Sequence, residues 1–200
     1  MKVPLFPLPT TVLFPRARMP LHIFEPRYRR MLADALAADR RIAMGLAVGK
    51  DEIRPVCGVG RVVRHEAFAD GTSDIVLEGE CRARILGMAL QGPYLTAELE
   101  HLEEAEAADL PPARRLAAAL RSRLAVSLRA VHGQKGEALM GALLAERPGA
   151  GGLADLAAEL LLAHPLQRQR VLEALDPLER LRAAAGLLGI PLVSSGPSLN

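Results

Sequence analysis

Alternating apolar and polar positions mark the first half of the chain as β-rich. The alternation is clearest in two runs, at residues 81–85 and 95–100. A period of two predicts strands with one buried and one solvated face. If these runs pair antiparallel, Arg82 and Arg84 face Glu98 and Glu100 across the sheet. Further runs that predict strands lie at residues 2–6, 20–25, 42–48, 56–68 and 75–77.

Proline and glycine divide these strands. Prolines at positions 7, 9 and 15 keep residues 7–19 extended. Asp70 and Gly71 form a dipeptide typical of a β-hairpin turn, and Gly58 and Gly60 indicate a bulge or tight bend. The pattern therefore predicts a sheet built from hairpins and one early crossing segment.

One helix interrupts the β-rich part. Pro26 suits the first position of a helix. Apolar residues then follow at helical spacing, which predicts a helix over residues 26–39. We expect the Glu25 carboxylate to accept hydrogen bonds from the free N–H groups at the start of this helix.

Beyond residue 108 the apolar spacing becomes helical. Leucines recur every four residues from Leu116 to Leu128, with Val131 extending the stripe and Gly133 ending the helix. Further helices are expected over residues 135–146, near residues 153–160, from residue 164, and after the N-cap residue Asp176. The predicted organisation is a β module at 1–108, a helical bundle at 109–192 and a tail at 193–200.

Composition narrows the class of protein. The net charge of +2 is too small to indicate a polyanion partner, and the chain has no Trp. Cys57 and Cys81 lie in apolar runs without a CxxC motif, as reduced core residues do in a cytoplasmic protein. No apolar stretch approaches the length of a membrane span.

The motifs of common catalysts are incomplete. Residues 45–50 resemble a phosphate-binding loop but are one residue short, and Asp51 stands at the Ser/Thr position. The five histidines lack metal-ligand spacing, and no Ser–Lys pair indicates a protease centre. His22 and Glu25 are expected on opposite faces, so they suggest no acid–base pair. The sequence therefore predicts no enzyme activity and no cofactor.

The motifs at residues 4–8, 12–15 and 20–28 resemble the Lon protease N-terminal domain family. Residues 70–85 match its central hairpin and residues 153–181 its later helical segment. Two positions depart from the family pattern: Arg16 replaces a usual Gly, and Ala83 replaces a usual aromatic residue. The resemblance implies an α+β fold, in which a PUA-like β-barrel with one early helix precedes a helical bundle. It also implies a role in recognising protein substrates.

The stretch from Phe14 to Tyr28 is the strongest candidate for a binding surface. The hypothesis is a non-catalytic module that binds exposed or unfolded protein segments. RNA binding by a PUA-like barrel and a small-ligand site within the barrel are the alternatives. Candidate peptide-binding residues are Phe14, Arg16, Met19, Phe24 and Arg27. Residues expected to be structural are Glu25, Pro26, Tyr28, Asp70, Gly71, Arg82 and Arg84.

Overall fold

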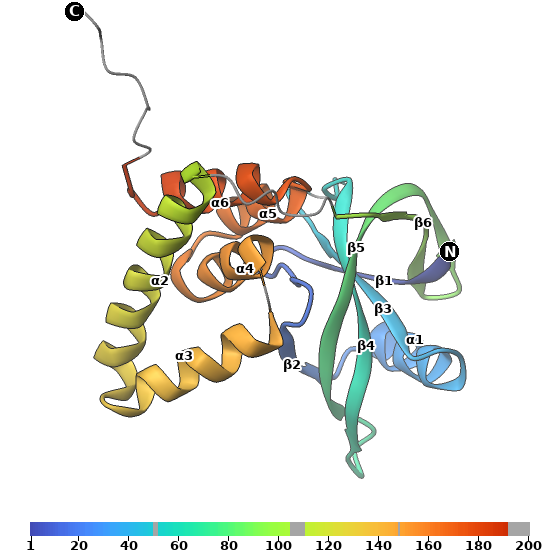
Figure 1. Ribbon diagram of the computed structural model, residues 1–200. Coiled ribbons are helices and arrows are strands. Elements are labelled where there is room, and N and C mark those ends of the chain that lie inside the picture. Colours follow the sequence, from blue (N-terminus) through green and yellow to red (C-terminus); the bar gives the residue numbers. More distant parts are fainter. Residues whose placement is uncertain (50–51, 105–110, 148, 192–200) are drawn as a thin grey trace, which may run out of the picture. The chain divides into compact units, whose positions relative to one another are not determined.

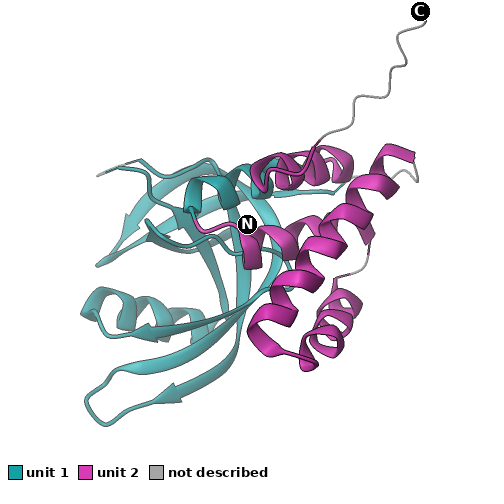
Figure 2. Cartoon of the chain, turned by 90° about the vertical axis from the view of Figure 1, so that its left-hand side faces the viewer, with its two compact units in different colours: residues 1–104, 164–175 teal, residues 105–163, 176–200 magenta. Residues whose placement is uncertain are grey.

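The chain divides into two compact units (Figure 2). The computed structural model describes residues 1–49, 52–104, 111–147 and 149–191. Unit 1 comprises residues 1–104 and 164–175, and unit 2 comprises residues 105–163 and 176–200. Residues 164–175 therefore belong with the sheet, whereas the sequence pattern assigned them to the helical bundle.

Unit 1 contains a mixed six-stranded sheet in the order β2-β5-β4-β3-β1-β6 (Figure 1). The strands are β1 (Lys2–Leu8), β2 (Arg18–Ile23), β3 (Arg41–Leu46), β4 (Val56–Ala67), β5 (Ser73–Gln91) and β6 (Tyr94–Leu102). β1 and β3 pair in parallel, and the other pairs are antiparallel. β6 also pairs with β5, which closes a circuit of five strands. The runs expected separately at 75–77 and 81–85 lie within the single strand β5.

The sheet packs around small and branched apolar side chains, as the low aromatic content requires. The buried cluster comprises Val3, Leu5, Ala43, Cys57, Val59, Ala83, Ala97 and Leu99. Ala83 is fully buried. Burial raises the pKa of the Cys57 thiol to about 12. This thiol is therefore a core group and not a reactive one.

Two helices belong to unit 1: α1 (Pro26–Ala37) and α5 (Pro165–Glu173). α1 begins at Pro26, as predicted, and buries Tyr28. The expected cap is wrong, because the Glu25 side chain makes no capping bond. Its carboxylate instead accepts a hydrogen bond from Arg27 Nε at 2.9 Å. A charge-assisted pair two residues away outcompetes the neutral backbone N–H groups.

Buried and half-buried polar bonds fix α5 to the sheet. Arg54 makes a bidentate pair with Glu173, at 2.9 and 2.8 Å. Arg82 is fully buried and donates from Nε to the Leu172 carbonyl at 2.9 Å.

The two arginines of β5 have different environments and different partners. Arg84 pairs with Glu100 at 2.8 Å, which confirms the cross-strand prediction. The prediction for Arg82 is wrong, because its guanidinium is buried and pairs with Glu104. A bulge between Ile85 and Gly87 places Glu98 opposite Gly87.

The segment before β2 crosses closely over the β4–β5 ladder at two glycines. A Cβ on Gly58 would lie 2.0 Å from the Leu13 carbonyl oxygen, and a Cβ on Gly79 would lie 2.0 Å from that of Phe14. Phe14 is fully buried under this crossing. Arg16 has φ 64°, a conformation that favours glycine. The arginine therefore adopts the backbone conformation that a glycine would adopt more easily.

Unit 2 consists of α2 (Pro111–His132), α3 (Lys135–Glu146), α4 (Gly149–Leu161) and α6 (Pro177–Leu187). α2 packs against the other three helices through its leucine stripe. Val131, however, is 76% exposed and does not extend the stripe. Asp176 caps α6 by accepting from two backbone N–H groups at 2.9 Å, as predicted. No described helix has both the length and the apolar character of a membrane span.

Candidate functional site

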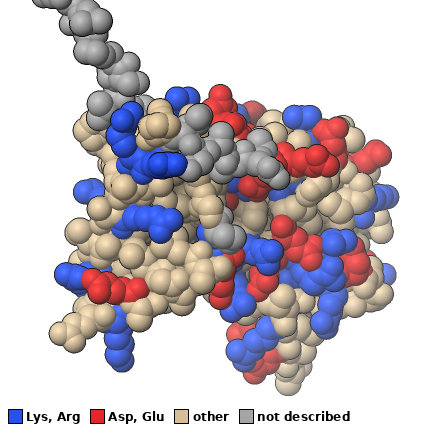
Figure 3. Space-filling view, viewed as in Figure 1, with Lys and Arg blue, Asp and Glu red and all other residues tan. Residues whose placement is uncertain are grey.

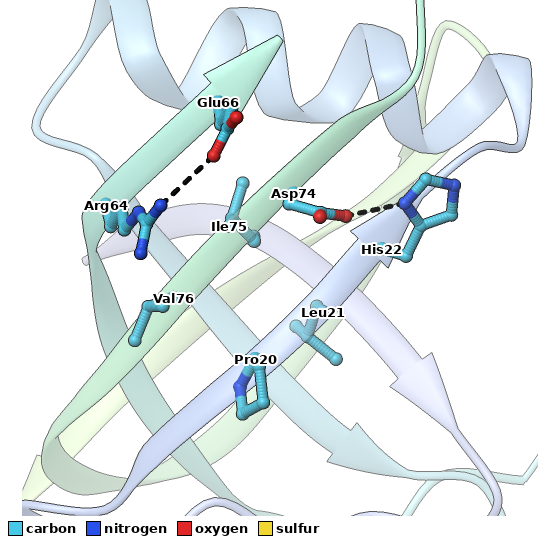
Figure 4. Close-up of a pocket in the computed structure, with 8 residues that line it drawn as sticks. All are labelled: Pro20, Leu21, His22, Arg64, Glu66, Asp74, Ile75 and Val76. Atoms are coloured by element: carbon cyan, nitrogen blue, oxygen red, sulfur yellow. Dashed lines mark hydrogen bonds and ion pairs between the residues drawn. The ribbon is translucent and has the colours of Figure 1, made fainter. Parts of the chain in front are cut away.

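The outward face of β2, β5 and β4 carries two rows of residues that are aligned across the three strands (Figure 4). One row aligns Pro20, Val76 and Arg64, and the next aligns His22, Asp74 and Glu66. Antiparallel register places the members of each row on the same face. A hollow of about 340 Å³ lies here, lined by Pro20, Leu21, His22, Arg64, Glu66, Asp74, Ile75 and Val76.

Three rings gather beside this hollow, and we call them the aromatic corner: His22, Phe24 and Phe68. The centroid of the His22 ring lies 6.0 Å from that of Phe24 and 6.4 Å from that of Phe68. Phe24 is 60% exposed and Phe68 is 41% exposed. Large apolar side chains grouped on the surface mark interaction sites more often than scattered ones do.

The hairpin tip that carries Phe68 is held in one shape. The Asp70 carboxylate accepts from the Thr72 backbone N–H at 2.9 Å and from the Thr72 hydroxyl at 2.7 Å. These bonds lower the pKa of Asp70. Gly71 has φ 81°, and a Cβ there would collide with the Arg29 guanidinium. The corner is therefore largely formed before any ligand arrives.

Two pairs of oppositely charged or hydrogen-bonded side chains lie around the corner. Asp74 bonds His22 Nδ1 at 2.6 Å, and Glu66 bonds Arg64 at 3.1 Å. Figure 3 shows acidic and basic side chains intermingled on the visible face of the sheet unit. Such a surface has no excess charge to attract a polyanion.

The side chains that line the hollow offer apolar and charged groups for contact with a ligand. Its lining contains no Ser, Thr or Cys that the His22–Asp74 pair could activate as a nucleophile. Within the described ranges, no group of three or more His, Cys, Asp and Glu residues could hold a metal ion.

Comparison of the sequence with models of known protein families shows which family the chain belongs to. The sequence model of the ATP-dependent protease La (LON) substrate-binding domain matches residues 2–189. The chain belongs to this family.

Individual Lon proteins support the assignment. Lon protease 2 of Herpetosiphon aurantiacus is 27% identical over 198 residues, which is 94% of this chain and 24% of that protein. A Lon protease of Dictyoglomus thermophilum is 27% identical over 188 residues, 90% of this chain and 23% of that protein. This chain thus spans about a quarter of the length of the curated relatives it matches.

Two solved structures share the fold. One is the N-terminal domain of the Mycobacterium avium complex Lon protease, with a TM-score of 0.77 and 22% identity, over 94% of this chain and 98% of that one. The other is a Lon N-terminal domain protein from Xanthomonas campestris, with a TM-score of 0.71 and 24% identity, over the same shares of the two chains. Unit 1 and unit 2 together therefore follow the Lon N-terminal domain fold.

The structure separates the five residues proposed for peptide binding in this Lon-family chain. Phe14 is fully buried, so its expected contact with a ligand is wrong. Arg16 lines a different hollow, with Arg41 and Glu80. Met19 also lies on β2, but its side chain points to the face opposite that of His22, which is the core side of the strand.

The other two of the five, Phe24 and Arg27, differ in their relation to the corner. Phe24 is part of it. Arg27 is exposed, bonds Glu25, and places its guanidinium 4.5 Å from the centroid of the Tyr28 ring.

Sequence reasoning missed His22 and Phe68 as members of the site. The sequence offers Glu25 as the acidic neighbour of His22, whereas its partner in the structure, Asp74, is 52 residues away. Phe68 carried a usable signal, because an aromatic residue two positions before an Asp-Gly turn lies close to the tip of a hairpin. Which other rings it would meet depends on the β2–β5 register.

Proposed function

We propose that unit 1 binds apolar, extended segments of other polypeptide chains at the aromatic corner and the hollow beside it. The observation that carries this proposal is the exposure of Phe24 and Phe68 around His22. Aromatic side chains supply large contact area with few rotatable bonds, and they dominate binding energy at many interfaces. The role is one of binding without catalysis.

Two further observations support a polypeptide ligand. Membership of the Lon substrate-binding domain family supports a substrate-binding role. The paired charges at the rim leave the apolar rings as the main attraction, which suits chains that have exposed their cores. A native protein with a polar surface would find little to contact here.

We further infer that the closed circuit of β5, β4, β3, β1 and β6 is the PUA-like barrel implied by the family. RNA binding remains the second candidate, since exposed rings can stack on bases. The balanced charges around the corner disfavour it. A small-ligand site is disfavoured because neither the hollow beside the corner nor the hollow that contains Arg16 is lined by Phe or Tyr.

The test is equilibrium binding of a fluorescently labelled protein that has been reduced and alkylated so that it stays unfolded. We expect the double variant Phe24→Ala/Phe68→Ala to bind roughly tenfold or more weakly than the wild type, as loss of two aromatic anchors requires. Leu90→Ala is the matched control, because Leu90 is 73% exposed on β5 outside the corner. Equal affinity of the double variant and the wild type would contradict the proposal. Equal affinity for the folded form of the same labelled protein would contradict it too, and salt-sensitive binding of single-stranded RNA would favour the second candidate.

A further inference from the structure

The outer edge of β2 offers backbone groups beside the aromatic corner. Among the described residues β2 pairs with β5 alone. Directly before β2, the Gly79 N–H donates to the Ala17 carbonyl at 2.9 Å. Antiparallel pairs alternate between residues that bond across the ladder and residues whose groups point away. Counting from Ala17, residues 19, 21 and 23 bond to β5, and residues 18, 20 and 22 direct their backbone groups to the outer edge. Of these, His22 belongs to the aromatic corner, and Pro20 lines the hollow beside it.

Pro20 fits this alternation independently. Proline has no N–H, so within sheets it is confined to positions that face away from the ladder. Pro20 and His22 are both exposed, and no backbone bond joins their outward groups to another described residue. Beside the corner, these two residues therefore present one donor, the His22 N–H, and two acceptors, the carbonyls of Pro20 and His22.

We propose that the bound segment adds to β2 as a further strand, with its apolar side chains against the aromatic corner. This mode of binding rests on the proposed function. Two N–H groups of the segment donate to the Pro20 and His22 carbonyls, and one of its carbonyls accepts from the His22 N–H. Backbone bonds of this kind recognise an extended chain whatever its sequence, and side-chain contacts at alternate positions add preference.

Pro20 makes the edge asymmetric. A carbonyl of the segment placed opposite Pro20 finds no donor, so of these two positions only His22 allows the complete exchange of bonds. The residue that supplies this bond also supplies a ring of the corner. Strand addition and side-chain contact are therefore aligned at one position of β2.

The first test is amide hydrogen exchange of the full chain, followed by NMR. The probe is an acetylated and amidated heptapeptide, Lys-Thr-Phe-Thr-Phe-Thr-Lys. We expect the His22 amide to exchange fast in the free protein and at least about tenfold more slowly at saturating peptide. The Leu21 amide, which faces β5, serves as the internal control and stays protected throughout.

The outcomes separate the two proposals. If the peptide shifts the Phe24 and Phe68 resonances but leaves exchange at His22 unchanged, strand addition is wrong and the proposed function stands. If the peptide shifts no resonance, the proposed function itself is contradicted and the strand addition fails with it.

The second test compares His22→Pro with His22→Ala in binding the same peptide. Both variants remove the ring and its bond to Asp74, but only proline removes the outward N–H. Because that N–H does not bond to β5, proline is expected to leave the β2–β5 ladder intact, as Pro20 does. We expect His22→Pro to bind roughly three- to tenfold more weakly than His22→Ala, the loss of one hydrogen bond. Equal affinities of two folded variants would overturn strand addition, and the exchange experiment decides if His22→Pro does not fold.

Discussion

Phe14 and Phe24 are the same residue type ten positions apart, yet the fold uses them in opposite ways. Phe14 is 0% exposed and Phe24 is 60% exposed. Phe14 belongs to the segment that crosses the sheet where Gly58 and Gly79 leave room for its backbone. Phe24 follows the end of β2, next to the hairpin tip that carries Phe68.

This difference shows that the stretch from Phe14 to Tyr28 consists of two consecutive parts with different roles. Its first part packs closely against glycines on β4 and β5, and it stabilises the fold. Its second part comprises the edge strand β2 and the start of α1, and it leaves the apolar ring of Phe24 on the surface. We expect substitutions in the first part to affect stability and substitutions in the second to affect binding.

The largest expected effect is on stability at Phe14. Phe14→Ala should lower the free energy of unfolding by about 3–5 kcal/mol, because it removes a fully buried ring and leaves a cavity. Phe24→Ala should change it by less than about 0.5 kcal/mol, as is usual for exposed side chains. Denaturant unfolding of the two variants measures both values. Equal losses would remove the distinction between the two parts.

The glycine crossing should show the next largest effect. Gly79→Ala should lower the free energy of unfolding by about 2–3 kcal/mol, because the new Cβ would overlap the Phe14 carbonyl and force the backbone apart. Gly87→Ala is the matched control on the same strand, since nothing lies within 4 Å of its Cβ position. Thermal unfolding of both variants decides the matter. A control as unstable as Gly79→Ala would show that loss of glycine, and not the crossing, is responsible.

A smaller effect is expected at Arg16. Its φ of 64° strains any residue with a Cβ. Arg16→Gly should therefore stabilise the fold, by at most about 1 kcal/mol, since glycine also adds entropy to the unfolded chain. The same unfolding measurement applies, with Arg16→Ala as the control that keeps the strain. A clear loss of stability in the glycine variant would mean that the Arg16 side chain stabilises the turn more than its backbone strains it.

The smallest effect concerns the hairpin tip and pH. The hydrogen bonds from Thr72 lower the pKa of Asp70 in the folded chain. A carboxyl with a lowered folded pKa contributes stability above its unfolded value of about 4, and that contribution is lost as pH falls through the folded pKa. Exchange of the Thr72 amide should therefore accelerate on acidification below about pH 4, relative to the intrinsic rate. Asp70→Asn keeps an acceptor without the titration, so it should lack this dependence, and an identical profile would contradict the role of Asp70.

Local signals accounted for much of the fold. Pro26 and Asp176 marked two helix starts, the Asp-Gly pair marked the β4–β5 hairpin, and alternation predicted that Arg84 faces a glutamate of the next strand. These features depend on residues that are neighbours in sequence or on a simple strand period.

Features that depend on distant partners escaped prediction. Arg82 read as a solvated strand residue because its partner carbonyl, at Leu172, is 90 residues away. Burial of Phe14 depends on glycines of two later strands. The aromatic corner likewise depends on the β2–β5 register, and of its three residues the sequence prediction included Phe24 alone.

The most direct measurement is to locate a bound chain on the surface. The unfolded probe protein, carrying a photoreactive phenylalanine analogue, is crosslinked to the wild-type chain, and the attachment sites are mapped by mass spectrometry. We expect attachment at residues 20–24 and 68, and its loss in the Phe24→Ala/Phe68→Ala variant. Attachment concentrated at the exposed Leu86, Met88 and Leu90 of β5, or on α2, would contradict it.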